Sequence, residues 1–171
     1  SSGTITGFGS VYVNGVKYET DNTTVYTIDD SPGSSDDDLA VGMRVTVSGT
    51  LIDDSNGIAT SISFNDDLEG PVSNLVDVGN DGLIKTFTTL GRQVRINSDT
   101  TSFDTSGLPV PFDFGSIAND DHVEVSGFLD SNNVMIATRV ELKDQTFNTS
   151  SIVEIRGTIE TVNTTLETFT L

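Results

Sequence analysis

Short runs of aspartate are the residues of this 171-residue sequence whose chemistry is simplest to name. Carboxylate oxygens in flexible loops are the ligands that Ca²⁺ prefers, so these runs are candidate calcium sites. The candidates are Asp36, Asp37, Asp38, Asp77 and Asp81. Segment 77–82 resembles the front of an EF-hand loop, but its third position is Gly79 and its twelfth would be Thr88, so the bidentate glutamate is missing. We therefore expect solvated loop carboxylates, with calcium binding as the alternative.

His122 is the only histidine, and beside Asp120 and Asp121 it could act as a general base. It opens an alternating segment and corresponds to Arg44 in a similar segment earlier in the chain. The alternation places both residues on the polar side of a strand. We therefore expect a solvated histidine without a catalytic role.

Tyr12 is the candidate ligand-binding residue. It alternates with Val11 and Val13, which places its ring on the opposite side of the strand. An outward tyrosine could stack on a sugar ring or on a partner protein. An isolated surface aromatic is the simpler expectation, because scattered exposed apolar residues are normal.

The overall composition excludes several classes of function. The chain has 26 Asp and Glu against 8 Lys and Arg, a formal charge of -18, which repels nucleic acid. Cysteine is absent from the sequence, which excludes disulfides, thiol catalysis and thiolate metal sites. No apolar run approaches the roughly 18 residues that a membrane span needs. Hydrophobic residues, 35% of the total, alternate with Thr, Ser and charged residues, which predicts half-buried strands.

The same strand sequence occurs twice in the chain. Residues 39–66 align with residues 117–144 without a gap, and VTVSGTL (45–51) matches VEVSGFL (123–129). The valines, the serine, the glycine and the leucine that the copies share are typical of core and curvature positions. A function specific to one copy should therefore lie where the copies differ, at Arg44 against His122, Thr46 against Glu124 and Thr50 against Phe128.

Each copy predicts five short strands. The segment around Asn14-Gly15 is a strong hairpin signal, because Asn-Gly tolerates positive φ at both turn positions. In the repeated strand Leu51, like its counterpart Leu129, falls in phase with valines that are expected to face inward. Gly49 and Gly127 fit places where a strand coils sharply or another backbone passes close.

Five strands per copy predict an all-β fold of two tandem small five-stranded OB-like antiparallel barrels, with a β-sandwich as the main alternative. The predicted divisions are a first barrel at residues 3–69, a second at residues 70–146 and the start of a third repeat at residues 147–171. Within this last segment, residues 154–162 are expected to pair with the second barrel and complete it. Polar connections, expected to form loops or a short helical turn, follow the third strand of each copy at residues 29–38 and 105–119.

Three segments of the first copy carry a family pattern: GTITGFGSVYVNGVKYET (3–20), DLAVGMRVTVSG (38–49) and IATSISF (58–64). Together they resemble the bacterial domain-of-unknown-function family 5666. The second copy departs from the pattern, since NDDH (119–122) replaces VGMR (41–44). The resemblance implies tandem OB-type barrels in secreted or lipid-anchored envelope proteins. Its motifs are structural, so it implies no catalytic residues.

The expected function is that of a non-catalytic structural or binding module in a bacterial repeat protein that is secreted, periplasmic or anchored to the outer membrane. The expected partners are other envelope proteins, glycans or further repeats of the same chain, and not nucleic acid. The alternative is a calcium-assisted or glycan-binding adhesion module that uses the acidic loops. A carboxylate-dependent hydrolase is the third hypothesis, which only the separation of two carboxylates in space could support.

Overall fold

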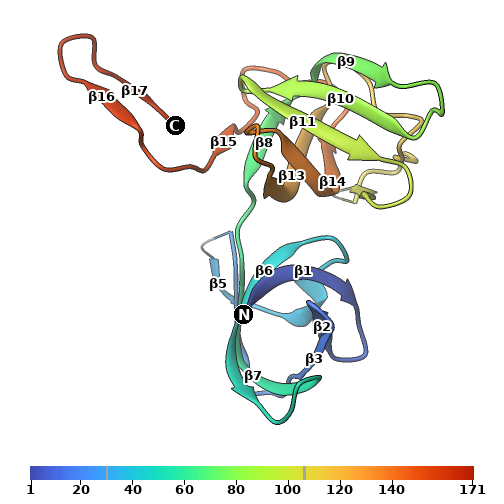
Figure 1. Ribbon diagram of the computed structural model, residues 1–171, viewed down its shortest axis with the longest axis vertical. Helices are drawn as coiled ribbons and strands as arrows, with labels where there is room; N and C mark the ends of the chain where they lie inside the picture. The colour runs from blue at the N-terminus through green and yellow to red at the C-terminus, as the bar shows by residue number, and fades with distance from the viewer. Residues whose placement is uncertain (30, 106) are drawn as a thin grey trace.

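The computed structural model describes residues 1–29, 31–105 and 107–171, and its regular structure is almost entirely β-strand. Figure 1 shows two groups of strands, one from each half of the chain, followed by a separate C-terminal hairpin. The all-β class that the alternating pattern predicts is therefore confirmed. Among the described residues, no helix is long and apolar enough to cross a membrane.

The first sheet contains seven strands: β1 (Ser2–Gly7), β2 (Val11–Val13), β3 (Val16–Glu19), β4 (Val25–Ile28), β5 (Ser31–Ser34), β6 (Arg44–Leu51) and β7 (Asn56–Phe64). Their order is β3-β2-β1-β6-β7-β4-β5, and β3 also pairs with β7. This additional pairing closes β1, β2, β3, β7 and β6 into a five-stranded barrel, beyond which β4 and β5 extend the sheet.

The barrel is mixed, so the prediction of purely antiparallel barrels is wrong. Strands β3 and β7 run parallel, with Lys17 opposite Asn56, whereas the other neighbours in the ring are antiparallel. The reason is geometric, because all neighbours around a closed ring can alternate in direction only when the number of strands is even. A closed ring of five strands therefore requires a parallel pair.

The connection between β5 and β6 contains the short 3₁₀ helix η1 (Asp36–Asp38), where the sequence predicts loops or a helical turn. Strand β5 also lies within the predicted connection at residues 29–38, and the sequence does not predict it. Residues 30 and 106, one in each of the two predicted connections, lie outside the described residues. The tight turn between β2 and β3 confirms the hairpin prediction, since Asn14 and Gly15 have φ angles of 53° and 80°.

A bulge interrupts the pairing of the repeated strand at the same place in both copies. The register shifts just before Gly49 in β6, and just before Gly127 in β13 (His122–Leu129). A Cβ at either glycine would overlap a carbonyl oxygen of the neighbouring strand, which confirms the predicted close approach. The extra residue of each bulge lies on the partner strand, at Thr60 of β7 and Thr138 of β14 (Met135–Asp144), and the alternation of faces reverses there. Leu51 and Leu129, predicted to face inward, keep the phase of the valines but are 58% and 46% exposed, and each is the last residue of its strand.

The second sheet contains β8 (Leu68–Pro71), β9 (Ser73–Val78), β10 (Ile84–Thr89), β11 (Arg92–Asn97), β12 (Ser102–Thr105), β13, β14 (Met135–Asp144) and β15 (Glu154–Ile155). Its order is β15-β8-β13-β14-β11-β10-β9, with β12 beside β14. This sheet is open, so the closure that the sequence predicts for both copies is present in the first alone. Strands β8 and β9 are consecutive in the chain, on either side of Val72.

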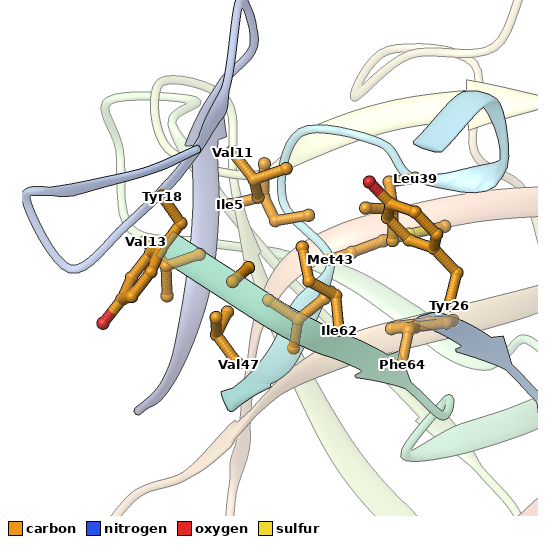
Figure 2. Packing of buried hydrophobic residues seen from close by; sticks show 12 residues of the cluster. Ile5, Val11, Val13, Tyr18, Tyr26, Leu39, Met43, Val47, Ile62 and Phe64 are labelled. Carbon is orange, nitrogen blue, oxygen red and sulfur yellow. The ribbon is translucent and has the colours of Figure 1, made fainter. Parts of the chain in front are cut away.

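Each sheet has its own hydrophobic core. Ile5, Ile62 and Phe64 are among the buried residues of the first core, and Phe87 and Leu142 are among those of the second. Figure 2 shows side chains from several strands of the first sheet converging on the interior of the barrel. The two sheets are therefore stabilised by separate apolar clusters.

One face of β13 is buried although the sequence predicts that it faces solvent. Glu124 and Ser126 lie on the polar side of the alternation but are only 3% and 1% exposed. The first copy contacts the neighbouring part of this surface, where Thr138 Oγ1 on β14 donates at 2.7 Å to Gly42 O, in the turn before β6. Alternation predicts which residues share a face, but it does not predict what covers that face.

The C-terminal segment first joins the second sheet and then leaves it. Strand β15 pairs antiparallel with β8, whereas β16 (Thr161–Asn163) and β17 (Thr168–Thr170) form a separate two-stranded sheet. Figure 1 shows this hairpin extending away from both larger sheets. Strand β8 crosses the predicted boundary at residue 69, and the domain divisions stay predictions.

Candidate functional site

Three carboxylates from separate parts of the chain meet beneath the surface. Asp66 lies in the connection between β7 and β8, Glu69 lies on β8, and Glu124 lies on β13. Oxygen atoms of the three side chains all lie within 4.8 Å of one another. The residues are only 2%, 9% and 3% exposed, so this carboxylate cluster is buried.

The pairing of β8 with β13 places two of the acids face to face. Glu69 lies directly opposite Glu124 in the antiparallel register. In the first sheet the equivalent pairing of β1 with β6 places Ser2 opposite Thr46, and their hydroxyl oxygens lie 3.0 Å apart. Like charges directly opposite each other destabilise a sheet, whereas two hydroxyls stabilise it. The same backbone arrangement therefore carries different chemistry in the two copies.

Two cations from β14 contact the carboxylate cluster. Lys143 Nζ donates to Glu124 Oε2 at 2.8 Å, and Arg139 Nη1 lies 3.7 Å from Glu124 Oε1. Arg139 also forms ion pairs with Glu141 at 2.7 Å and with Asp104 at 3.0 Å. Its charge is shared among three carboxylates, so Lys143 is the closest counter-charge of Glu124.

His122 is buried at 5% exposure, which corrects the prediction of a solvated histidine. Its Nε2 lies 2.9 Å from Glu69 Oε1 and 2.9 Å from Ile152 O. An ionised carboxylate and a carbonyl can only accept, so we assign the proton to Nε2. The ring also packs edge-on against Phe147. The prediction is wrong because the chain beyond β14 folds back over this part of β13.

Asp66 is the least satisfied carboxylate of the cluster. Its Oδ2 has no hydrogen-bond partner within the part of the chain that the structure describes. Burial, reinforced by the charge of Glu124, raises the pKa of Asp66 to about 7. Burial also raises the pKa of Glu69 and the pKa of Glu124. The carboxylate cluster therefore favours either a bound cation or a bound proton near neutral pH.

An acidic cleft of about 460 Å³ opens beside Glu124, between residues of the two copies. Its acids outnumber its bases: Asp29, Asp37, Asp38, Asp104, Glu124 and Glu141 against Arg139 and Lys143. A cleft lined predominantly by one sign of charge concentrates the opposite ion. The acidic cleft therefore offers cations a path towards the carboxylate cluster.

The calcium candidates identified from the sequence lie outside the carboxylate cluster. Asp36, Asp37 and Asp38 form η1 and are exposed, and the latter two line the acidic cleft. Asp77 on β9 and Asp81 in the turn after it are also exposed. Calcium binding by either group stays a prediction.

Tyr12 lies on β2 and is 36% exposed, whereas Val11 and Val13 beside it are buried. Its outward orientation follows the predicted alternation. A role for Tyr12 in binding a sugar or a partner stays a prediction.

Sequence reasoning missed Asp66 and Glu69, and it identified Glu124 only as a difference between the copies. A signal for Glu69 was present, because aligning Gly3 with Gly70 places Ser2 against Glu69. Two uncharged residues thus become two acids at paired positions. Asp66 has no such signal, because it reaches the cluster through the connection between the sheets.

A family model matches both copies of the repeat. The model, described as a domain of unknown function (DUF5666), matches residues 2–63 and residues 69–141. No curated protein and no solved structure matches the chain. The two matched segments cover most of the sequence and confirm the resemblance found in its motifs. The chain therefore belongs to the DUF5666 family.

Proposed function

We propose that the chain is a non-catalytic structural module of a secreted or envelope-anchored bacterial repeat protein, in which neighbouring copies are held in a fixed orientation. The observation that carries this proposal is a hydrogen-bonded junction between the copies, formed by Gly42 and Arg44 of the first and Gly127 and Thr138 of the second. The envelope location is supported by the family resemblance of the first copy. Further repeats and other envelope proteins are the partners that such a module would contact.

Hydrogen bonds to backbone atoms cross the junction. Thr138 Oγ1 donates to Gly42 O at 2.7 Å, and Arg44 Nη1 donates to Gly127 O at 3.3 Å. Gly127 N also donates at 3.2 Å to Oδ2 of Asp67, in the connection between the copies. Gly42 has a φ of 92°, and a Cβ there would lie 2.6 Å from Thr138 O. Close backbone packing of this kind supports a fixed orientation, because backbone atoms cannot rotate away as exposed side chains do.

The proposal includes OB-type barrels as the repeating unit. In chain order the ring strands of the first barrel are β1, β2, β3, β6 and β7, and β6 returns to lie beside β1. Such a return is the Greek-key connection of five-stranded OB folds. The second sheet repeats these neighbours, since β13 lies beside β8 and β14 runs parallel to β11. The break at Val72 is the main difference between the two arrangements.

A fixed junction predicts a single distance between the copies. The sequence has no cysteine, so spin labels attach only at introduced ones. We expect labels at Asn22→Cys and Ser131→Cys, exposed positions in different copies, to give a narrow distance distribution in double electron–electron resonance. The pair Asn80→Cys and Ser131→Cys, both in the second copy, is the reference for a narrow distribution. A broad distribution for the first pair alone would contradict the proposal.

The repeat provides a matched pair of variants for the same measurement. Thr138→Val removes the donor to Gly42, whereas Thr60→Val removes the equivalent hydroxyl of the first copy, which donates to Ser48 O within its own sheet. We expect Thr138→Val to broaden the distance distribution between the copies and Thr60→Val to leave it unchanged. An equal effect of the two variants would show that the junction contact does not set the orientation.

A further inference from the structure

We propose that Asp66, Glu69 and Glu124 bind one Ca²⁺ ion, buried beside the junction of the two copies. Two observations carry the proposal: the convergence of three buried carboxylates, and the buried Asp66 Oδ2, which lacks a hydrogen-bond partner among the described residues. This site is separate from the loop aspartates that the sequence suggests. It does not depend on the structural role proposed above.

The spacing of the carboxylates fits the size of a calcium ion. Ca²⁺ binds oxygen at about 2.3–2.6 Å, so oxygens on opposite sides of one ion lie about 4.6–5.2 Å apart. The oxygens of the carboxylate cluster lie within 4.8 Å of one another. One ion can therefore contact all three side chains while β8 and β13 keep their pairing.

The chemistry of the donors selects a hard cation. Carboxylate oxygens suit Ca²⁺, Mg²⁺ or Mn²⁺, whereas structural zinc sites use Cys and His. Mg²⁺ demands near-ideal octahedral geometry at about 2.0–2.1 Å and keeps several of its own waters, so it rarely binds in an all-protein cage. Glu69 and Glu124 are fixed on paired strands. The longer and more variable bonds of Ca²⁺ therefore fit this site better.

The neighbouring groups leave room for a cation between the acids. Lys143 binds Glu124 Oε2 and leaves Glu124 Oε1 without a hydrogen bond among the described residues, with Arg139 Nη1 at 3.7 Å. His122 binds Glu69, so it would orient this ligand in the manner of outer-shell groups at metal sites. Asp66 faces both glutamates. A divalent ion among the three acids would compensate their mutual repulsion, and water from the acidic cleft would complete its coordination.

The first copy shows that the strand pairing does not need these acids. Ser2 and Thr46 occupy the positions equivalent to Glu69 and Glu124, and they pair through their hydroxyls. The double variant Glu69→Ser/Glu124→Thr therefore recreates a pair that this fold already accommodates. This variant removes two calcium ligands and keeps the register of the strands.

Calcium titration of the full chain tests the site. In calcium-free protein we expect isothermal titration calorimetry with CaCl₂ to give one ion per chain, and millimolar CaCl₂ to raise Tm by several degrees, because a ligand that binds only the native state stabilises it. Glu69→Ser/Glu124→Thr should lose the heat of binding and any rise in Tm beyond that caused by NaCl at equal ionic strength. The control Asp36→Asn/Asp77→Asn removes the same charge from exposed positions and should keep both.

A separate variant, Asp66→Asn, distinguishes a bound cation from a bound proton. If the cluster binds Ca²⁺, the amide should weaken the affinity on the order of tenfold or more while the cooperative melt in EDTA is retained. If the cluster instead holds a shared proton, the wild-type protein will show no heat of binding with CaCl₂ and no rise in Tm beyond that caused by NaCl at equal ionic strength. That result, or a full calcium response in Glu69→Ser/Glu124→Thr, would overturn the proposal. Neither result would change the distance measurement that tests the structural role.

Discussion

At the scale of single residues, the buried carboxyl of Asp66 couples folding to pH in the calcium-free protein. Its pKa is raised from 3.8 to about 7, first by burial and then by the charge of Glu124. Between these two pH values the folded protein retains a proton that the unfolded chain has released. Stability therefore decreases as the pH rises through this window and levels off above about pH 7. The raised pKa values of Glu69 and Glu124 act in the same direction.

We expect the free energy of unfolding in EDTA to be lower at about pH 8 than at about pH 5, and Asp66→Asn to reduce this difference because the amide does not titrate. Urea unfolding at the two pH values measures both quantities. Asp54→Asn, which neutralises an exposed loop position, is the control and should leave the difference unchanged. An undiminished difference in Asp66→Asn would show that other groups cause the pH dependence.

The differences between the two copies indicate part of the carboxylate cluster, whereas the motifs indicate none of it. The aspartates chosen for their loop spacing remain outside the cluster, whereas the difference between Thr46 and Glu124 identifies one of its three acids. His122 was misjudged because Phe147 and Ile152, which cover it, lie far along the chain. The local sequence shows which chemical groups a residue offers, but the burial of that residue depends on segments that lie far away in the chain.

At the scale of strands, the bulge glycines leave no space for a side chain. We expect Gly49→Ala and Gly127→Ala to lower the free energy of unfolding by about 2 kcal/mol or more, because a Cβ would displace the neighbouring backbone. Gly7→Ala on β1 is the control, since its Cβ would lie 4.0 Å from the nearest atom, on Tyr12. Urea unfolding measures all three variants. Equal losses in the three variants would contradict the steric explanation, because a Cβ at Gly7 meets no close neighbour.

The strands themselves were largely predictable, and their directions were not. Turn chemistry at Asn14-Gly15 and the alternation of the repeated strand each correspond to an observed element. Alternation could not reveal the exposure of Leu51, because this residue keeps the phase of the buried valines but lies at the last position of β6. The parallel pairing of β3 with β7 follows from ring closure, a property of the whole barrel that no local segment contains.

At the scale of the whole molecule, the formal charge of -18 produces repulsion across the surface. We expect NaCl to raise Tm, because the screening length falls from about 30 Å at 0.01 M salt to about 8 Å at 0.15 M. Thermal melts followed by circular dichroism measure this shift. At equal ionic strength, CaCl₂ should raise Tm more than NaCl does in the wild-type protein. In Glu69→Ser/Glu124→Thr the two salts should raise Tm equally. A Tm that does not respond to NaCl would contradict the prediction.

The arrangement of the two copies was beyond sequence reasoning. The junction joins residues far apart in the chain, such as Gly42 with Thr138 and Arg44 with Gly127. The motifs that contain Gly42, Arg44 and Gly127 do not indicate these contacts, because the acceptors are backbone carbonyl oxygens, which every residue has. The cluster depends on the same arrangement, because Asp66 lies in the connection that leads from one sheet to the other.

The likeness of β6 and β13 creates a risk of error during folding, because tandem copies can exchange equivalent strands. In the native pairs Ser2 meets Thr46 and Glu69 meets Glu124. An exchange would place each glutamate opposite a hydroxyl and divide the three acids between different sheets. Only the native pairing assembles the complete calcium site. Binding of the proposed ion would therefore stabilise the native strand pairs relative to the exchanged ones and select against misfolded chains.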